Sequence, residues 1–288
     1  MRALRRRLQD AAKLSRVNQI VIERDYAQSY VLLGIGESEA LGETFVFKGG
    51  TALKKIHFGS YRFSDDLDFS AIDGPRSDDL EGAIRKAIAR AEAAVRKIAP
   101  LTFTVERYEE RDPHPGGQEA FIVRAQFPWQ RQPMVPVKIE VTHDEPVLLA
   151  SDRQSIHHGY EETIDANLRA YSLEEIGAEK LRSTQQTLAK LTARGWTRPR
   201  ARDYYDLWHL VRAPEDRLSW ERVSAVLPQK CGVRDVHLTS VEQVFEARLV
   251  EEVRATWERT LGPFVPELPN VETALADLQE RLSALLRF

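Results

Sequence analysis

Polar and apolar residues alternate in several short stretches of the first half of the chain. In 137–142, Val137, Ile139 and Val141 would lie on one face of a strand and the residues between them on the other. This two-residue period predicts that 137–142 is a half-buried strand. Further strands are expected at 44–47, near 65–70, and in a hairpin of 101–105 and 120–127 with its turn at 113–117.

Apolar residues at helical spacing dominate the second half of the chain. Ser172 and Glu175 form a capping box that opens a helix to about residue 191. Ser240 and Gln243 form a second such box, which predicts a long helix over 240–261. The remaining expected helices are 1–33 in two pieces, 51–56, 78–99, 203–211 and a final one to residue 288, with 143–171 as a connector.

This distribution predicts the α+β class. A mixed-sheet core with N-terminal helices is expected over residues 1–150, and a mostly helical C-terminal domain over 151–288.

Composition narrows the class of protein. The chain has 288 residues, of which 42% are hydrophobic and 30% charged, as in globular proteins. No apolar run approaches the roughly 20 residues of a membrane span, and no apolar segment of a signal peptide follows the N-terminal arginines. The single cysteine, Cys231, excludes an internal disulfide and favours a cytoplasmic location. Because the net charge is only −3, affinity for nucleic acid would have to come from a local patch.

The candidate chemistry lies between residues 45 and 70. On a strand, Asp66 and Asp68 share one face, and two carboxylates at this spacing suit Mg²⁺ or Mn²⁺ completed by substrate phosphates. Gly49 and Gly50, upstream, offer backbone N–H groups that can receive those phosphates. Asp-x-Asp pairs are also common in solvated turns, but apolar neighbours on the opposite face favour a metal and nucleotide site here.

These residues resemble the nucleotidyltransferase superfamily and, more narrowly, the AbiEii/MenT family of bacterial toxins. The match is Lys48 to Leu53 with F-K-G-G-T-x-L and Arg62 to Asp68 with R-x-S-x-D-x-D, and the resemblance extends to about residue 212. It implies a nucleotidyltransferase-like fold and transfer of a nucleotide from an NTP to RNA, at the 3′ end of tRNA. It also implies that the protein is the toxin of a toxin–antitoxin pair, with a cognate antitoxin as partner.

The residues around the signature are given roles on this basis. Asp66 and Asp68 are expected to be catalytic metal ligands, and Glu140 is a candidate third carboxylate, with an exposed residue paired to Lys138 as the alternative. The residues expected to bind the nucleotide are Lys48, Gly49, Gly50, Thr51 and Ser64. For Ser64, expected on the same strand face as Asp66, a capping or edge serine is the alternative.

Two downstream residues match family motifs. The resemblance implies that Lys180, in an E-K-L context, and Asp203, in R-D-x-x-D-L, are catalytic. An N-cap of the following helix is the alternative for Asp203. Just before it lies a cationic segment without acids, predicted to bind RNA and otherwise a solvated loop: Arg194, Arg198, Arg200 and Arg202.

Two other functions remain open at this point. One is nucleotidyl transfer to a hydroxyl of a protein or small molecule, and the other is a non-catalytic nucleotide-binding module. The presence of all four of Asp66, Asp68, Lys180 and Asp203 argues against the second.

Overall fold

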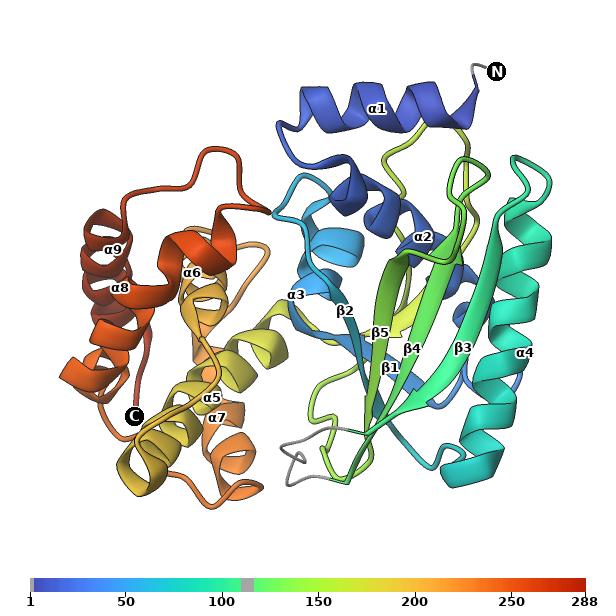
Figure 1. Cartoon of the computed structure of the whole chain (residues 1–288). Helices are drawn as coiled ribbons and strands as arrows, with labels where there is room; N and C mark the ends of the chain where they lie inside the picture. Colours follow the sequence, from blue (N-terminus) through green and yellow to red (C-terminus); the bar gives the residue numbers. More distant parts are fainter. Residues whose placement is uncertain (1–2, 110–116) are drawn as a thin grey trace. The chain divides into compact units, whose positions relative to one another are not determined.

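The computed structural model describes residues 3–109 and 117–288 (Figure 1). The chain divides into two compact units, Met1–Tyr171 and Ser172–Phe288. The first is built on a sheet and the second on helices, so the α+β class is confirmed.

The first unit contains one seven-stranded mixed sheet in the order β3-β4-β5-β2-β1-β7-β6. Strand β1 runs antiparallel to β2 and parallel to β7, and β2 runs parallel to β5. The other neighbouring pairs are antiparallel. The strands are β1 (Phe45–Lys48), β2 (Asp66–Ala71), β3 (Thr102–Tyr108), β4 (Gln118–Gln126), β5 (Val135–Thr142), β6 (Arg153–Ser155) and β7 (Asn167–Ala170).

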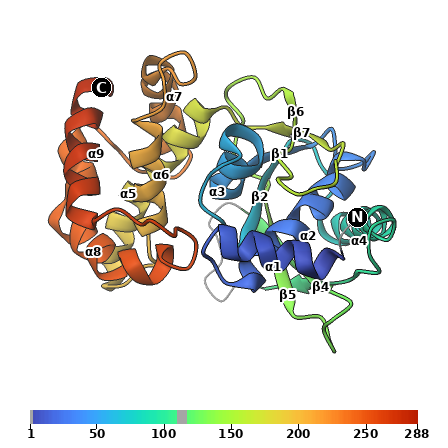
Figure 2. The same ribbon diagram turned by 90° about the horizontal axis from the view of Figure 1, so that it is seen from above.

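In the described part of the first unit, five helical segments accompany this sheet. Helices α2 and α4 pack against each other and against strands, α2 on β5 and β7, and α4 on β3 (Figure 1). The short α3 packs against β1 and β2 (Figure 2). The bounds are α1 (Leu4–Leu14), α2 (Gln19–Gly36), α3 (Gly49–Ala52), a π-helical segment η1 (Leu53–Phe58) that continues α3, and α4 (Ser77–Val95).

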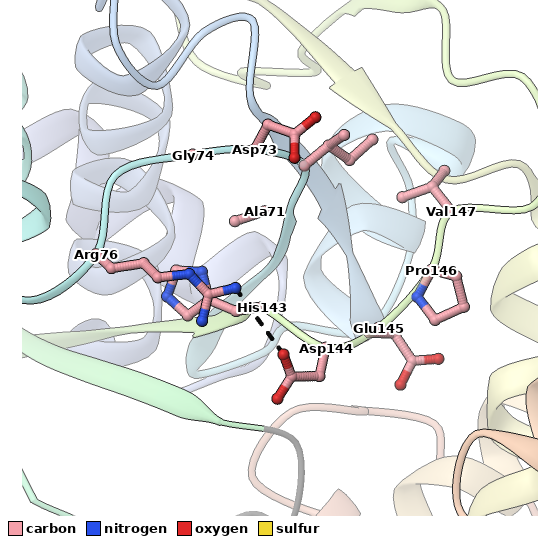
Figure 3. Close-up of a pocket in the computed structure, with 10 residues that line it drawn as sticks. Ala71, Asp73, Gly74, Arg76, His143, Asp144, Glu145, Pro146 and Val147 are labelled. Atoms are coloured by element: carbon pink, nitrogen blue, oxygen red, sulfur yellow. Dashed lines mark ion pairs between the residues drawn. The ribbon is translucent and has the colours of Figure 1, made fainter.

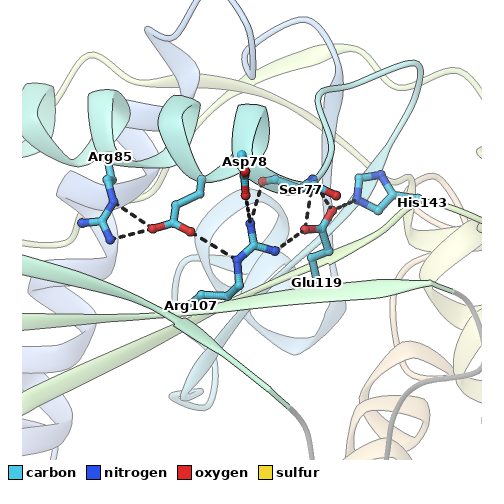
Figure 4. A network of polar contacts seen from close by, with 7 residues as sticks. Ser77, Asp78, Arg85, Arg107, Glu119 and His143 are labelled. Carbon is cyan, nitrogen blue, oxygen red and sulfur yellow. Dashed lines mark hydrogen bonds and ion pairs between the residues drawn. The ribbon is translucent and has the colours of Figure 1, made fainter.

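A polar network joins α4 to the edge of the sheet (Figure 4). Arg107 on β3 binds Glu81 on α4 at 3.2 Å and Glu119 on β4 at 2.8 Å. Glu119 also accepts hydrogen bonds from the backbone N–H of Ser77, and it lies 3.0 Å from Nε2 of His143. The network therefore fixes the start of α4 to β3, β4 and the end of β5.

The second unit is helical throughout its described secondary structure. Ser172 caps α5 by accepting a hydrogen bond from the backbone N–H of Glu175, as the sequence predicts. Tyr204 and Trp257 are buried in its core. Its elements are α5 (Leu173–Arg194), α6 (Ala201–Leu210), α7 (Trp220–Gly232), a 3-10 segment η2 (Val241–Phe245), α8 (Ala247–Leu261) and α9 (Val271–Leu285).

Two expectations about elements are wrong. The supposed connector 143–171 contains β6 and β7, which join the sheet of the first unit, so this sheet extends beyond residue 150 and the second unit begins at Ser172. The supposed helix 240–261 is broken at Glu246, whose ψ of 136° is not helical. The capping box is also absent: the Ser240 side chain makes no capping hydrogen bond, and the Gln243 side chain accepts from the backbone N–H of Thr239 rather than from that of Ser240.

The hairpin is confirmed as the antiparallel pair β3 and β4, while residues 113–116 of its expected turn lie outside the described part of the chain. In the described ranges, no helix combines the length and apolar character needed to span a bilayer.

Candidate active site

The glycine segment begins a helix directly after β1. The expected turn at Gly49 and Gly50, with a helix from Thr51, is corrected here: α3 starts at Gly49. Gly49 has a φ of +76°, a backbone conformation that residues with a side chain rarely adopt. A Cβ at this position would lie 2.3 Å from Oδ2 of Asp68. Only glycine therefore lets the backbone approach the Asp68 carboxylate this closely.

The next two residues are held against the strand that carries the carboxylates. A Cβ at Gly50 would lie 2.4 Å from Nη2 of Arg62, whose guanidinium is buried against the helix start. Thr51 is buried, and its hydroxyl donates a hydrogen bond to the backbone carbonyl of Asp66. The hydroxyl of Thr51 thus ties α3 to β2, while the first N–H groups of α3 have no partners within the helix and suit phosphate oxygens.

The carboxylate pair lies on the face of β2 that the sequence predicts. Leu67 and Phe69 are fully buried, whereas Asp66 and Asp68 on the opposite face are half-buried. On the neighbouring β5, Glu140 stands in register with Asp68. The β2–β5 pairing therefore brings three carboxylates to one face of the sheet.

Glu140 pairs with Lys138, as its alternative expects, but it is half-buried rather than exposed. It forms an ion pair with Lys138 on the same strand face, and it lies beside Asp68. Burial, together with the charges of Glu140 and Asp66 and a hydrogen bond with Glu140, raises the pKa of Asp68 well above its usual range. Crowding of like charges on this scale is relieved by a cation or a proton.

Lys48, on the neighbouring strand β1, brings a positive charge close to Asp68. It is buried at the end of β1, in register with Asp68, and its Nζ lies 5.5 Å from the centre of the Tyr171 ring. Its charge opposes the upward shift in the pKa of Asp68.

Helix α2 supports the segment before β2. Gln28 donates hydrogen bonds to the carbonyls of Ser64 (3.0 Å) and Asp65 (3.1 Å), and Arg24 forms an ion pair with the Asp65 side chain. Asp65 therefore pairs with α2 and does not belong to the carboxylate pair of Asp66 and Asp68. Ser64 precedes the strand, which begins at Asp66, so the expectation that it shares a strand face with Asp66 is wrong.

The donor set suits a hard divalent cation completed by substrate. Among residues 3–109 and 117–288, no group of three or more His, Cys, Asp or Glu side chains is placed to hold a metal ion by itself. Mg²⁺ is commonly bound through one or two carboxylates with phosphates and water supplying the rest. Asp66 and Asp68 fit that mode, and such a cation would stabilise the charged form of Asp68, which burial and the neighbouring carboxylates disfavour and whose pKa they therefore raise.

A second polar centre lies in the helical unit. Lys180 on α5 is buried, and its Nζ lies 2.9 Å from Oδ1 of Asp203 and 2.6 Å from Oδ2 of Asp206. Both aspartates are on α6, three residues apart and on one face, as their spacing predicts. Lys180 is therefore clamped between two carboxylates.

Two further groups fix Asp203. Oγ of Ser183 donates a hydrogen bond to its Oδ2 at 2.9 Å, and Arg200 lies 3.3 Å from the same oxygen. Although burial alone would raise it, the charges of Lys180 and Arg200 hold the pKa of Asp203 well below its usual range. Asp203 is not the N-cap of α6, which is Arg200, so its carboxylate is available to this centre.

The cationic segment between α5 and α6 is arranged unevenly. Arg200 belongs to the Asp203 centre, and Arg202 lies over the Phe264 ring and donates to the carbonyl of Thr260. Arg194 lies over the ring of Trp196, and Arg198 is exposed.

A cavity of about 630 Å³ lies elsewhere in the first unit, past the ends of β2 and β5 (Figure 3). It is lined by segments 71–74 and 143–147 with Arg76, which faces Asp144 at 3.9 Å. None of the predicted site residues lines it.

Comparison with known proteins identifies the family. A family model described as the nucleotidyl transferase AbiEii toxin of type IV toxin–antitoxin systems matches residues 32–281. The chain belongs to this family. The AbiEii-family chain is also similar to MenT4, a nucleotidyltransferase toxin from Mycobacterium tuberculosis H37Rv. The TM-score is 0.61 at 21% identity, over 97% of this chain and 87% of MenT4, which establishes a common fold. No protein with a curated functional description matches the chain.

Some residues of this AbiEii-family site were missed by sequence reasoning. The motif places Arg62 near the signature but does not encode its burial against Gly50 at the helix start. Ser183 gave one usable signal, since it lies three residues after Lys180 and so on the same helix face. The Gln28 contact to the signature carries no local sequence signal.

Proposed function

We propose that this protein is a metal-dependent nucleotidyltransferase that moves a nucleotide from an NTP to RNA, specifically to the 3′ end of tRNA in the cytoplasm. In this proposal it acts as a toxin restrained by a cognate antitoxin. Membership of the AbiEii family supports nucleotidyl transfer by a toxin. The observation that carries the chemistry is the convergence of Asp66, Asp68 and Glu140 on one sheet face beside the start of α3.

We assign the first centre to the triphosphate. The N–H groups at the start of α3 would bind phosphate oxygens, and Lys48 would add a fixed positive charge. Asp66 and Asp68 would hold Mg²⁺ or Mn²⁺, which when bound stabilises the charge that develops on the attacking and leaving oxygens. Glu140 would keep Asp68 oriented. Ser64, which precedes the strand, is retained as a candidate contact for the terminal phosphate.

We assign the second centre to the acceptor. Asp203 is ionised at neutral pH, so it can accept a hydrogen bond from the attacking hydroxyl and orient it. Lys180 holds Asp203 in position through its ion pair. Because Lys180 binds two carboxylates, we assign it this positioning role rather than direct contact with the triphosphate. In the cationic segment, Arg194, Arg198 and Arg202 would contact phosphates of the RNA.

The nature of the acceptor is tested by incubating the protein with NTPs labelled at the α-phosphate, Mg²⁺ and total RNA, and then repeating the reaction without RNA. We expect label in small RNA only when RNA is present. Label in the protein itself, or in an added small molecule, would replace RNA with the other acceptor class. No label under any condition would identify the chain as a nucleotide-binding module.

A further inference from the structure

Trp196 differs from the other tryptophans of the described chain in its exposure. Trp196 is 52% exposed, whereas Trp220 and Trp257 are buried. The indole N–H groups of Trp129 and Trp208 are hydrogen-bonded to Glu23 and Asp277. A single exposed aromatic residue is common on protein surfaces, so a role for Trp196 has to be argued from its surroundings.

The backbone at the end of α5 accounts for the exposed position of the ring. Gly195 ends α5 in the left-handed conformation, with φ of 72°, and its N–H donates to the carbonyl of Leu191. This C-cap turns the chain out of the helix and leaves Trp196 at its surface.

Arg194 forms a stacked pair with the ring. Its guanidinium carbon lies 3.8 Å from the centre of the Trp196 ring, and its Nε donates to the Trp196 carbonyl at 3.3 Å. The guanidinium covers part of the ring and fixes it in place, while half of the side-chain surface stays accessible. The result is a held aromatic plane rather than a mobile side chain.

The chemistry around this plane is that of a nucleic-acid surface. Residues 193–202 contain four arginines and no acid. Aromatic planes set among cations bind single-stranded nucleic acid, because every base can stack and the cations follow the phosphates. An exposed indole in an acid-free, arginine-rich segment favours RNA over a protein partner.

We propose that Trp196, backed by Arg194, is a stacking site for an unpaired base of the acceptor RNA near its 3′ end. This inference rests on the proposed function, in which Asp203 orients the accepting hydroxyl. Trp196 is four residues before Arg200, which contacts Asp203, so its Cα lies within about 14 Å of that of Arg200. A few nucleotides span such a separation, so the base that Trp196 binds lies in a short single-stranded 3′ tail.

The test compares two RNA hairpins that differ only in a four-nucleotide single-stranded 3′ tail. Affinity is measured without NTP, by fluorescence anisotropy at fixed salt, for the whole chain of 288 residues. We expect Trp196→Ala to weaken binding of the tailed hairpin by about tenfold and to leave the blunt hairpin unaffected. Trp196→Phe should retain most of the affinity, because a smaller ring still stacks. Phe288→Ala removes another exposed aromatic, 58% exposed, and is the matched control that should change nothing.

Tryptophan fluorescence gives a second readout of binding that also does not depend on activity. Binding of the tailed hairpin should quench part of the tryptophan fluorescence of the wild type, and Trp196→Phe should remove that quenching. Equal affinities of wild type and Trp196→Ala for the tailed hairpin would overturn the inference and point to a protein partner for the exposed ring. In that case, labelling of the tailed hairpin by the wild type would show that the proposed function itself still holds.

Discussion

At the scale of single residues, the site depends on Gly49, a backbone position that has no room for a side chain. Gly49 combines a positive φ with a carboxylate oxygen where a Cβ would be. Because Gly49 has no Cβ, the carboxylate of Asp68 can lie close to the start of α3. The glycine is thus part of the geometry that places phosphate-binding N–H groups beside the carboxylates.

We predict that Gly49→Ala removes transferase activity and lowers the free energy of unfolding. The left-handed backbone alone costs about 1–2 kcal/mol for alanine, and the methyl group would displace Asp68. Gly82→Ala in α4 is the control, since a Cβ there meets no atom within 4 Å and alanine favours a helix by about 0.8–1 kcal/mol. Urea unfolding and the labelling assay measure both effects. A Gly49→Ala protein as stable and active as wild type would contradict this account.

Some residues of the site were predictable and others were not, for a physical reason. The shared face of Asp66 and Asp68 follows from strand alternation alone, as does the burial of Leu67 and Phe69. The burial of Arg62 against Gly50 depends on a packing contact between separate segments, which no local pattern encodes.

At the scale of elements, α2 is the support of the signature. Asp25 on α2 lies 2.9 Å from Nζ of Lys55 on η1, and both side chains are buried. Lys55 also donates to the carbonyl of Asp25 and to Oγ of Ser29, each at 3.0 Å. Although burial opposes it, the charges of Lys55 and Lys54 hold the pKa of Asp25 below its usual range. The pair fixes the segment that continues α3.

We predict that Lys55→Met lowers the free energy of unfolding by about 3–5 kcal/mol, because it leaves the Asp25 charge buried without its cation. Adding Asp25→Asn to Lys55→Met should recover part of this loss, since it removes the stranded charge while the amide oxygen still accepts the hydrogen bond from Tyr160. Urea titrations of the wild type, the two single variants and the double variant give the coupling. Strictly additive losses would show that the two side chains act independently.

The elements differ in how well the sequence specifies them. Helix α4 and strand β5 carry several turns or pairs of periodic residues and were anticipated within a few residues. Strands β6 and β7 have only three and four residues, and they exist because β7 pairs with β1, more than a hundred residues earlier. The supposed helix 240–261 is wrong because the chain leaves the helical conformation at Glu246, whose side chain caps α8 by accepting a hydrogen bond from the backbone N–H of Arg248, and the pattern at Ser240 and Gln243 does not encode that break.

At the scale of the whole molecule, the net charge of −3 means that attraction of RNA has to come from local cationic patches. Membership of the AbiEii toxin family makes toxicity the expected biological effect.

We predict that expression of the wild type slows bacterial growth and that Lys180→Ala and Asp203→Ala each relieve this effect, because both disrupt the centre assigned to the acceptor. Arg254→Ala, which removes an exposed ion pair with Glu272, should remain toxic. Growth curves at matched expression measure this, and equal toxicity of all four proteins would separate the effect from nucleotidyl transfer.

The most direct test of the central claim is incorporation of label from α-labelled NTPs by the wild type, Asp66→Asn and Asp73→Asn. Asp66→Asn keeps the shape of the side chain while removing a charge from the carboxylate face. Asp73, exposed beyond the other end of the same strand, is the control, since asparagine tolerates its φ of 51°. With equal unfolding midpoints, we expect Asp66→Asn to lose at least about a hundredfold in rate and Asp73→Asn to match the wild type. A folded Asp66→Asn protein that transfers nucleotide at the wild-type rate would contradict the account.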